Sequence, residues 1–497
     1  MQLTDLLAGY LSRSFQIDIE VKDLALDSRK VKPGDLFFAL PGSQTDGERY
    51  LVEAMVKQAC AILKTGEQEA IQWQESVPII TLPNLLTHLG SLAAKFFGYP
   101  SRQLTMIGVT GTNGKTSCCY FLAQALTHLN KPCAIIGTLG YGFIHALHST
   151  GMTTPDAITL QRCLKELVNQ GAQAVVMEVS SHALMQHRVA GIDFEVAVFT
   201  NLTQDHLDYH GTMENYALAK RRLLHWPGLT KLVINYDDPE GRVWLQQADK
   251  KNKICLYAKK TQLAPLLAAN SSLNYIVVKK AELSLAGMQL NFASTWGDGI
   301  LNLDLLGQFN VSNLLAVMGV LGLLGFAKLE FVTAVKQLIN VPGRMQCIRY
   351  AGKPLVIVDF AHTPDALEQV LTTLKAISKQ KLICVFGCGG NRDRAKRPLM
   401  AAIAERYADL IVVTSDNPRN EDPQEIVTDI VQGFINRQAV YIELDREKAI
   451  WQAIRLGQAG DMVLIAGKGH ETIQIIKDKQ IPFDDVQKVK QALQMNP

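Results

Sequence analysis

Apolar residues along the chain occur in short runs that are separated by longer amphipathic stretches. Between residues 105 and 235 these runs predict β-strands at Thr105–Thr110, Ala134–Thr138, Ala174–Met177, Val196–Thr200 and Leu232–Asn235. Helical stretches lie between several of the strands, and the clearest of them is Lys115–Leu129. Alternation of strands and helices predicts a mostly parallel, doubly wound sheet.

The two flanking regions contain the same kinds of segment. Near the start, Leu36–Leu40 predicts a strand between two turns, and beyond residue 340 further strands are expected at Leu355–Asp359, Leu382–Phe386, Leu410–Val413 and Met462–Ala466. Gly98–Pro100 and Asn340–Gly343 predict domain boundaries. We therefore expect an α/β protein with a small N-terminal α/β domain (1–99), a central doubly wound domain (100–339) and a C-terminal Rossmann-like domain (340–497).

Composition narrows the functional class only slightly. Hydrophobic residues make up 47% and charged residues 20% of the 497 residues, and the formal net charge is +3. Basic runs are short, so no nucleic-acid partner is expected. No basic leader precedes an apolar segment, and the longest apolar run, Leu314–Ala327, is too short to insert into a membrane. Nine cysteines without a CxxC pair predict free thiols in a reducing compartment, so we expect a cytoplasmic protein.

The strongest local motif is a glycine-rich segment from Gly108 to Thr116, between a predicted strand and a predicted helix. Glycines allow backbone amides to face phosphate oxygens, and the helix N-terminus adds partial positive charge. Lys115 can reach the outer phosphates, and the Thr116 hydroxyl suits Mg²⁺. The general P-loop pattern has glycine where this chain has Val109, so a glycine-rich turn with a surface lysine is the alternative. The loop predicts a nucleoside triphosphate, which kinases, GTPases, motors and ligases all use.

Further motifs follow in a fixed order over essentially the whole chain. Thr110–Thr116 resembles the ATP loop of the Mur ligase family, and other family motifs match Glu178–His182, Asn201–His206, Tyr216–Lys220, Asn235–Asp238, Gly307–Asn310 with Asn313, Pro342–Arg344 and Asp359–Leu367. One departure is Phe360, where the family commonly has tyrosine. The resemblance implies a monomer with a UDP-binding domain at 1–99, an ATP-binding P-loop ATPase domain at 100–339 and an amino-acid-binding domain at 340–497.

A second set of motifs resembles the branch of the family that adds a diamino acid. These motifs are Asp27–Arg29, Thr153–Pro155, Gln186–Arg188, Gly387–Arg392, Asp416–Arg419 and Gly467–Glu471. The resemblance implies an ATP-dependent peptide ligase that adds meso-2,6-diaminopimelate to UDP-N-acetylmuramoyl-L-alanyl-D-glutamate (UDP-MurNAc-L-Ala-D-Glu) in peptidoglycan precursor synthesis. ATP would convert the carboxylate into an acyl phosphate, which the amine attacks through a tetrahedral intermediate. Positioning and charge neutralisation would supply most of the catalysis.

The resemblance also implies which residues bind ATP and two Mg²⁺ ions. The ATP residues would be Gly111, Thr112, Asn113, Gly114, Lys115, Thr116, Ser117, Asn310, Arg344 and Asp359. One Mg²⁺ would bind Thr116 and Glu178, and the other His206 and Lys220; Lys115, Glu178, His206 and Lys220 would be the catalytic set. Because an ammonium cannot ligate a cation, the family carbamylates this lysine with CO₂, a reaction that requires a neutral amine and a lowered lysine pKa.

Substrate residues are carried over in the same way. The UDP part would contact Leu26, Ser28, Ser43, Gln44 and Thr45, the muramoyl-dipeptide part Thr153, Thr154, Ser180, Gln186 and Arg188, and meso-diaminopimelate Arg392, Asp416, Asn417, Pro418, Arg419, Gly467 and Glu471. This diamino acid differs from lysine by a distal carboxylate, for which Arg419 supplies a guanidinium fork, while Glu471 accepts from the distal ammonium. A buried Arg419 would exclude lysine, because the guanidinium would lose its partner.

Other interpretations of the same residues stay open at this point. Read alone, Lys220 could belong to a solvated helix face, His206 to a core, and Asp416–Pro418 to a turn. The chain could also be a sister ligase that adds L-lysine, or a ligase similar to folylpolyglutamate synthetase, although it differs from that enzyme in the first domain and in the Asp416–Arg419 motif. An ATP-gated scaffold protein without chemistry is the remaining alternative.

Overall fold

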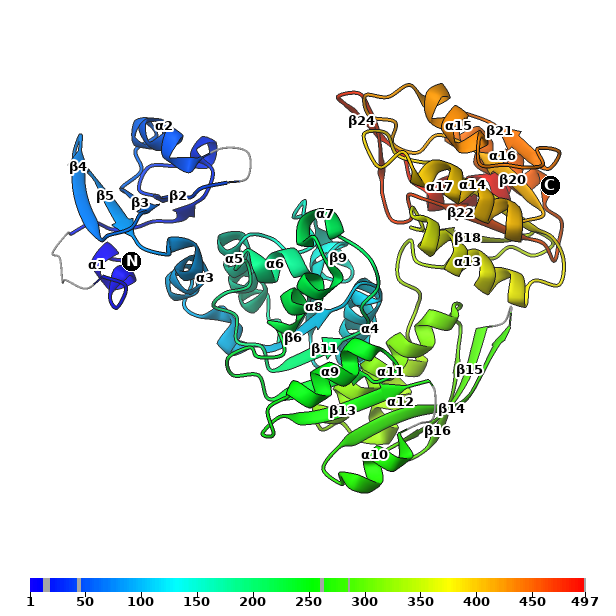
Figure 1. The fold of residues 1–497 in the computed structure, drawn as a ribbon, viewed down its shortest axis with the longest axis horizontal. Helices are drawn as coiled ribbons and strands as arrows, with labels where there is room; N and C mark the ends of the chain where they lie inside the picture. The colour runs from blue at the N-terminus through cyan, green and yellow to red at the C-terminus, as the bar shows by residue number, and fades with distance from the viewer. Residues whose placement is uncertain (12–17, 43–45, 260–262, 285–286, 496–497) are drawn as a thin grey trace. The chain divides into compact units, whose positions relative to one another are not determined.

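The computed structural model describes residues 1–11, 18–42, 46–259, 263–284 and 287–495 (Figure 1). The described chain forms two compact units. The first contains 1–277, 294–296 and 315–334, and the second contains 278–293, 297–314 and 335–497. None of the helices in the described ranges combines the length and the apolar character that crossing a bilayer requires.

The N-terminal sheet has the strand order β1-β2-β3-β5-β4. Its strands are β1 (Leu24–Ala25), β2 (Leu36–Ala39), β3 (Ala61–Thr65), β5 (Val77–Leu82) and the antiparallel β4 (Ala70–Gln74). Both faces of β2 are buried: Leu36 and Phe38 pack with α1 (Leu3–Leu7) and α3 (Leu85–Phe96), whereas Phe37 packs with α2 (Leu51–Val56). A strand covered on both faces reads as a continuous apolar run, so the predicted strand at 36–40 is confirmed.

The central sheet is built around β6 (Thr105–Thr110), which lies between β10 (Ala174–Glu178) and β11 (Val196–Phe199). Beyond β10 follow β7 (Cys133–Gly137), β8 (Gly140–Phe143) and β9 (Ala146–His148), and beyond β11 follow β12 (Lys231–Asn235), β13 (Lys253–Ala258), β14 (Asn274–Ser284), β15 (Gly287–Ser294) and β16 (Gly299–Leu303). In the sheet order β7-β10-β6-β11-β12-β13-β14, each strand pairs in parallel with the next. The five predicted strands and their doubly wound sheet are therefore confirmed. The strands β8, β9 and β13–β16 of this sheet were not predicted.

The helices of this region place functional segments at one edge of the central sheet. They are α4 (Lys115–His128), α5 (Ala157–Asn169), α6 (Ser181–Met185), α7 (Leu207–His210), α8 (Met213–Arg221), α9 (Pro239–Gln247), α10 (Ala264–Ala269), α11 (Gln308–Leu323) and α12 (Lys328–Lys336). Because neighbouring parallel strands end at the same edge, the segments that follow β6, β10 and β11 lie together there.

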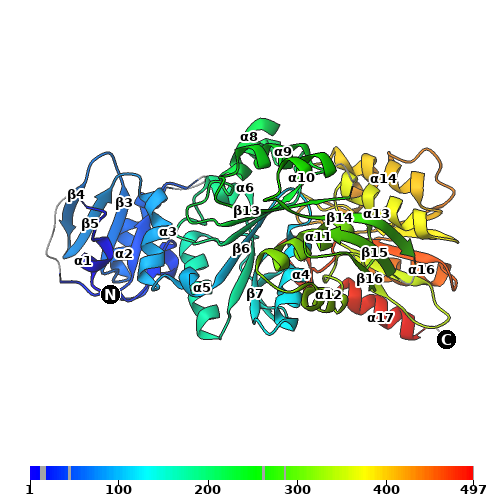
Figure 2. The ribbon, with the colours of Figure 1, turned by 90° about the horizontal axis from the view of Figure 1, so that it is seen from below.

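The C-terminal sheet has the order β17-β18-β22-β19-β20-β21. Its strands are β17 (Gln346–Ile348), β18 (Leu355–Asp359), β22 (Met462–Ala466), β19 (Leu382–Phe386), β20 (Leu410–Val413) and β21 (Val440–Ile442), so the four predicted strands have the expected bounds. On one face pack α13 (Pro364–Ile377), α14 (Lys396–Tyr407) and α15 (Pro423–Val431), and on the other α16 (Arg446–Leu456) and α17 (Asp485–Met495). Figure 2 shows α13 and α14 above and α16 and α17 below. A short hairpin, β23 (Ile473–Ile476) with β24 (Lys479–Pro482), follows β22.

A buried ion pair connects α16 and α17 to this sheet. Arg446 and Asp485 are both fully buried, and the guanidinium donates through Nε and Nη2 to the two carboxylate oxygens at 2.8 and 2.7 Å. Arg446 Nη2 also donates to Ala466 O at the end of β22 (3.0 Å). A guanidinium without solvent requires such partners, so this pair fixes where β22 ends relative to α17.

Removal of the carboxylate from this pair should destabilise the second unit strongly. Asp485→Asn leaves the Arg446 charge buried without its counter-ion, and we expect the free energy of unfolding to fall by about 3–5 kcal/mol. Urea denaturation followed by circular dichroism measures the change. Glu282→Gln, in an exposed pair with Lys280, is the matched control and should change little. A loss no larger than that of the control would contradict the structural role of the pair.

Candidate active site

The phosphate loop is held in a conformation that requires glycine. Gly111 and Gly114 have φ values of +144° and +87°, which residues other than glycine rarely adopt. A Cβ on Gly111 would lie 1.9 Å from Thr200 Oγ1. The amide of Asn113 donates to Asn201 Oδ1 (2.9 Å), which ties the loop to the segment after β11. The loop therefore presents the start of α4 as a preformed concave backbone, the arrangement that binds phosphate in P-loop proteins.

Two lysine ammonium groups converge on one backbone oxygen in this loop. Lys115 Nζ and Lys220 Nζ each donate to Gly111 O at 2.9 Å, and Lys115 also donates to Thr112 O (2.8 Å). Lys220 is 1% exposed. Burial first, and then the charge of Lys115, lowers the pKa of Lys220 well below its usual value, with Asp205 acting weakly in the opposite direction. The site therefore favours a bound anion, or a Lys220 that has lost its proton.

Glu178 ends β10 beside the loop and is 2% exposed. Its Oε1 accepts from Thr116 Oγ1 (2.9 Å) and from the Thr138 amide (2.8 Å), and its Oε2 accepts from Thr138 Oγ1 (3.3 Å). Gly137 makes room for the carboxylate, since a Cβ there would lie 2.4 Å from Oε1. The structure thus brings Thr116 and Glu178 together, as the sequence predicted, and a hydroxyl beside a carboxylate is a suitable oxygen donor set for Mg²⁺.

His206 and Lys220 both lie close to the ring of Tyr216. The Tyr216 ring centroid is 4.4 Å from Lys220 Nζ and 6.1 Å from the His206 ring centroid. His206 is followed by α7 and contacts the ring of His182 with a centroid distance of 4.9 Å. Within the described ranges, histidine, cysteine, aspartate and glutamate side chains do not gather in threes as a metal site would need. His206 Nε2 lies 3.4 Å from Asp205 Oδ2, so a cation beside His206 would need further ligands besides this pair.

The residues predicted for the muramoyl dipeptide are connected to one another and to Glu178. Thr154 is buried and its hydroxyl donates to Glu178 O (2.7 Å), so it fixes the backbone at the end of β10. Arg188 donates through Nη1 to Thr154 O (3.0 Å) and through Nε to Gln186 Oε1 (2.9 Å), while burial lowers its pKa. Thr153 lies 3.2 Å from Thr138 Oγ1, and Ser180 caps α6 through the Ala183 amide.

The residues predicted for the UDP part are only partly described. Ser28 is buried and its hydroxyl donates to Glu53 Oε2 (2.7 Å), and Leu26 packs at the edge of the core between α1 and α3. Ser43, Gln44 and Thr45 lie outside the described residues. Within the described part, Ser28 therefore already has an anionic partner, and a ligand would compete with Glu53 for its hydroxyl.

The other nucleotide residues predicted from the sequence belong to the second unit. Asp359 is buried at the end of β18, where it accepts from the Met345 amide (2.7 Å) and the Ala361 amide (2.8 Å). Burial raises the pKa of Asp359, and the charge of Arg344 opposes that rise. The Arg344 guanidinium lies 4.9 Å above the Phe360 ring. Asn310 is buried on α11, and its side chain donates to Leu306 O (2.7 Å), a hydrogen bond that serves the fold.

Most residues predicted for the amino-acid substrate lie on segments that follow the adjacent strands β22, β19 and β20. Asn417 is 4% exposed, and its Nδ2 donates to Glu471 Oε2 (2.8 Å). Arg419 donates through Nη1 to Gly390 O (2.9 Å) and has a left-handed backbone (φ 51°) that two hydrogen bonds to the β23 segment maintain. Such strain in a non-glycine residue is typical of functional sites.

The remaining residues of this set support the same loops. A Cβ on Gly467 would lie 2.6 Å from Asp416 Oδ2, so the two segments are in close contact. Pro418 is buried, whereas Arg392 is exposed. The structure thus brings together Asp416, Asn417, Arg419, Gly467 and Glu471. Arg392 is exposed and borders this group, since a Cβ on Gly389 would lie 2.9 Å from Arg419 Nη1 and 3.8 Å from Arg392 Cγ.

Sequence reasoning overlooked two residues at these sites. Tyr216 lies one helical turn before Lys220 on α8, and burial raises its pKa to about 12. Lys468 is fully buried among the residues predicted for the amino-acid substrate. Tyr216 lies in the motif Tyr216–Lys220 and Lys468 in the motif Gly467–Glu471. Each is close in sequence to a predicted site residue, and that closeness could have indicated its place in the site.

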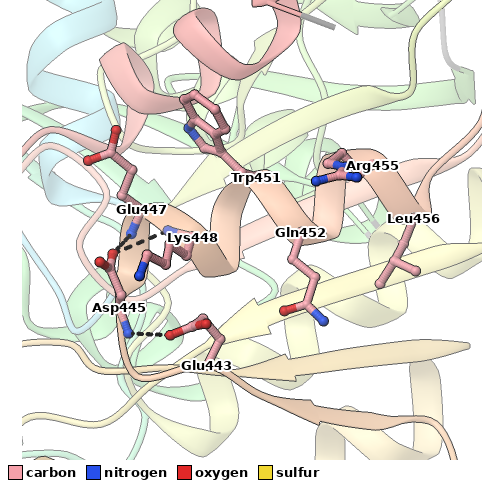
Figure 3. Close-up of a pocket in the computed structure, with 8 residues that line it drawn as sticks. All are labelled: Glu443, Asp445, Glu447, Lys448, Trp451, Gln452, Arg455 and Leu456. Atoms are coloured by element: carbon pink, nitrogen blue, oxygen red, sulfur yellow. Dashed lines mark hydrogen bonds between the residues drawn. The ribbon is translucent and has the colours of Figure 1, made fainter.

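A separate hollow of about 690 Å³ lies on α16 (Figure 3). It is lined by Glu443, Asp445, Glu447, Lys448, Trp451, Gln452, Arg455 and Leu456. Figure 3 shows Trp451 and Gln452 on opposite sides of the helix, and Asp445 caps the helix by accepting from two backbone amides. None of the predicted site residues lines this hollow, which is therefore distinct from the candidate active site.

Family models match three consecutive parts of the chain. The model for the Mur ligase family catalytic domain matches residues 20–97, the Mur ligase middle domain 109–321, and the Mur ligase glutamate ligase domain 343–469. The chain is also 47% identical over 485 residues to the UDP-N-acetylmuramoyl-L-alanyl-D-glutamate--2,6-diaminopimelate ligase of Coxiella burnetii, with 97% of each chain covered. The chain belongs to the Mur ligase family. The resemblance that the motifs predicted is confirmed, and the protein is an ATP-dependent ligase of this family.

Solved structures agree with this assignment. A structure of a UDP-N-acetylmuramoyl-L-alanyl-D-glutamate--2,6-diaminopimelate ligase matches this Mur ligase with a TM-score of 0.71 and 37% identity, covering 99% of each chain. A folylpolyglutamate synthase of Mycobacterium tuberculosis matches with a TM-score of 0.61 and 20% identity over 77% of this chain and 92% of its own. The second likeness shows a shared fold alone. The predicted fold class, with its central P-loop sheet and its Rossmann-like C-terminal sheet, is confirmed.

The space for the Glu178 carboxylate offers a direct test of the site. In Gly137→Ala the added methyl would overlap Oε1 and displace the carboxylate from Thr116 and Thr138, and we expect ligase activity to fall about 100-fold, the cost of a small misplacement. Phosphate release measures the activity. Gly319→Ala, whose Cβ would lie 3.1 Å from Cys255 Sγ, crowds the core without contacting Glu178 and is the control. Equal losses in both variants would argue for a general packing defect.

Proposed function

We propose that this Mur ligase joins meso-2,6-diaminopimelate to UDP-N-acetylmuramoyl-L-alanyl-D-glutamate, with ATP as the activating substrate, in the cytoplasm and as a monomer. The observation that carries the proposal is the pairing of Arg419 and Glu471 through Asn417 on the C-terminal sheet edge. A guanidinium beside a carboxylate is complementary to an amino acid with a distal carboxylate and a distal ammonium. The diaminopimelate ligases similar to this chain have the same named substrate.

The three predicted domains would divide the reaction among them. Residues 1–99 would bind the UDP part through Leu26 and Ser28, residues 100–339 the ATP, and residues 340–497 the amino acid. ATP phosphorylates the substrate carboxylate, and the amine then attacks the acyl phosphate through a tetrahedral intermediate. The protein contributes mainly by holding both reactants in place and by neutralising charge.

The phosphates would lie against the loop at Gly111–Ser117, where Lys115 Nζ, which donates to Gly111 O and Thr112 O, would turn to the phosphate oxygens. Asn310, Arg344 and Asp359 are the other residues expected to contact ATP. Thr116 and Glu178 would hold one Mg²⁺, whose chemistry is to neutralise the negative charge on the transferred phosphoryl group. His206 and Lys220 would hold a second Mg²⁺.

Lys220 would act as a carbamate. Its ammonium shares one acceptor with Lys115, an arrangement in which two cations repel each other. Because burial lowers the pKa of Lys220, a neutral amine that can add CO₂ is accessible. The added carboxylate would turn a repulsive contact with Lys115 into an attractive one and supply the oxygen ligands that a cation beside His206 needs.

The muramoyl dipeptide would lie along Thr153, Ser180, Gln186 and Arg188. Arg188 is the residue with the charge to bind the substrate carboxylate, and Gln186 and Thr154 already fix its position. Thr154 would act indirectly through the end of β10. Asp416, Pro418 and Gly467 would shape the amino-acid pocket, and Arg392 would reach the second substrate carboxylate from the surface.

The central experiment measures phosphate release against a panel of amino acids. We expect release to require ATP, Mg²⁺, the UDP-muramoyl dipeptide and meso-diaminopimelate together, with mass spectrometry detecting the tripeptide product. L-Lysine in place of meso-diaminopimelate should support far less turnover. Turnover with lysine alone would favour the sister ligase, and release without either substrate would favour an ATP-gated scaffold.

Arg419 should determine the preference for the distal carboxylate. We expect Arg419→Ala to lower kcat/KM for meso-diaminopimelate by about 100-fold or more and to remove most of the preference over L-lysine, because the charged partner of the carboxylate is lost. Steady-state kinetics with both amino acids measure this ratio. Arg394→Ala, which removes an exposed arginine paired with Asp429, is the control. A variant that kept the full preference would refute the role of Arg419.

Loss of the Lys220 carbamate should be repairable by small carboxylic acids. We expect Lys220→Ala to lose at least about 100-fold of its activity, the scale on which removal of a positioned group acts, and to regain part of it in formate or acetate. Acetamide, which has a similar size and no charge, should restore nothing. Near-normal activity of the variant without additives would end the carbamate proposal.

A further inference from the structure

Lys468 lies between the segments that carry Asn417 and Glu471. It follows β22, its side chain is 0% exposed, and it lies three residues before Glu471. Its ammonium donates to Glu471 Oε2 (2.8 Å), Asn417 Oδ1 (3.1 Å) and Ile473 O (2.7 Å). An ammonium has three donors, and all three are used here. Lys468 therefore has no donor left for a substrate and can act only through its neighbours.

The same contacts determine the orientation of the Asn417 amide. Lys468 can only donate and an ionised Glu471 can only accept, so Oδ1 must face the lysine and Nδ2 the carboxylate. The Ile475 amide donates to the same Oδ1 at 3.0 Å, which agrees with this orientation. The three side chains thus form a network in which each polar group has a defined role.

One oxygen of Glu471 remains for a ligand. Oε2 accepts from both Lys468 and Asn417, whereas Oε1 takes part in no hydrogen bond recorded among the described residues. Glu471 is 32% exposed, in contrast to the buried lysine beneath it. The lysine therefore holds the carboxylate with one oxygen engaged below and the other oxygen accessible.

We propose that Lys468 is a positioning residue that sets the preference for a distal ammonium, because it fixes Glu471 Oε1 in place to accept from that group. The inference rests on the proposed function. Without Lys468 the Glu471 carboxylate loses its ionic partner and Asn417 Oδ1 loses one of its two donors, so the accessible oxygen is held less firmly in place. The loss should affect the distal ammonium far more than the rest of the substrate.

The test compares meso-diaminopimelate with 2-aminopimelate, which lacks only the distal amine. We expect Lys468→Met to lower the ratio of kcat/KM for these two amino acids about tenfold or more, the usual effect of removing a partner from a charged hydrogen bond. The change should lie mainly in KM for meso-diaminopimelate, with KM for ATP and the UDP-muramoyl dipeptide unchanged. Lys488→Met, which removes a lysine paired with Glu447 on another surface, is the control and should leave the ratio unchanged.

A double-variant cycle separates positioning from general stability. If Lys468 acts through Glu471, adding Lys468→Met to Glu471→Gln should change the ratio by no more than about twofold, because the effects of groups that act as a unit do not add. The double variant also removes both charges, so it tests the inference if Lys468→Met alone fails to fold. An unchanged ratio in Lys468→Met, or full additivity in the double variant, would overturn the role of Lys468 alone. Wild-type protein that ignored meso-diaminopimelate would instead overturn the proposed function.

Discussion

Positive charge that is buried against backbone carbonyl oxygens is the constraint on which the first site depends. Lys115 Nζ and Lys220 Nζ both donate to Gly111 O at 2.9 Å, so two ammonium groups lie close to one neutral acceptor. Two cations around one neutral acceptor are stable only if something removes or offsets charge. In the proposed function a triphosphate would do so for one lysine, and loss of a proton followed by carbamylation would do so for the other. The proposed phosphate loop, metal residues and lysine carbamate would all follow from this one electrostatic arrangement.

The second unit uses buried cations differently. Arg446 has a full carboxylate partner in Asp485 and holds the end of β22, whereas Lys468 divides its ammonium among a carboxylate, an amide and a carbonyl. The first pair is complete and serves the scaffold. The second leaves a carboxylate oxygen unused and therefore retains the capacity to bind. Comparable burial of a charge can thus serve stability or recognition, depending on whether the partner is saturated.

Glycine and strained backbone mark the positions where these charges have to be close to other groups. Gly137 leaves space for Glu178, Gly111 for Thr200, and Arg419 accepts a left-handed backbone to reach Gly390. A side chain at either glycine would clash with its neighbour, and the left-handed backbone of Arg419 is strained for a residue other than glycine. Their grouping at the carboxyl edges of two parallel sheets fits the general location of ligand sites in α/β proteins.

The sequence by itself determined many of the buried parallel strands, the order of the motifs and hence the family. Buried parallel strands such as β6 and β19 are apolar on both faces, so they are visible without a structure. The strands β13–β16 were not predicted, because strand formation also depends on pairing and packing in the folded sheet, which a local sequence pattern does not encode. Tertiary structure alone decided that Lys220 and Lys115 share an acceptor and that Lys468 connects Asn417 to Glu471. Those contacts join segments dozens of residues apart, and charge burial, which sets their chemistry, exists only after the chain has folded.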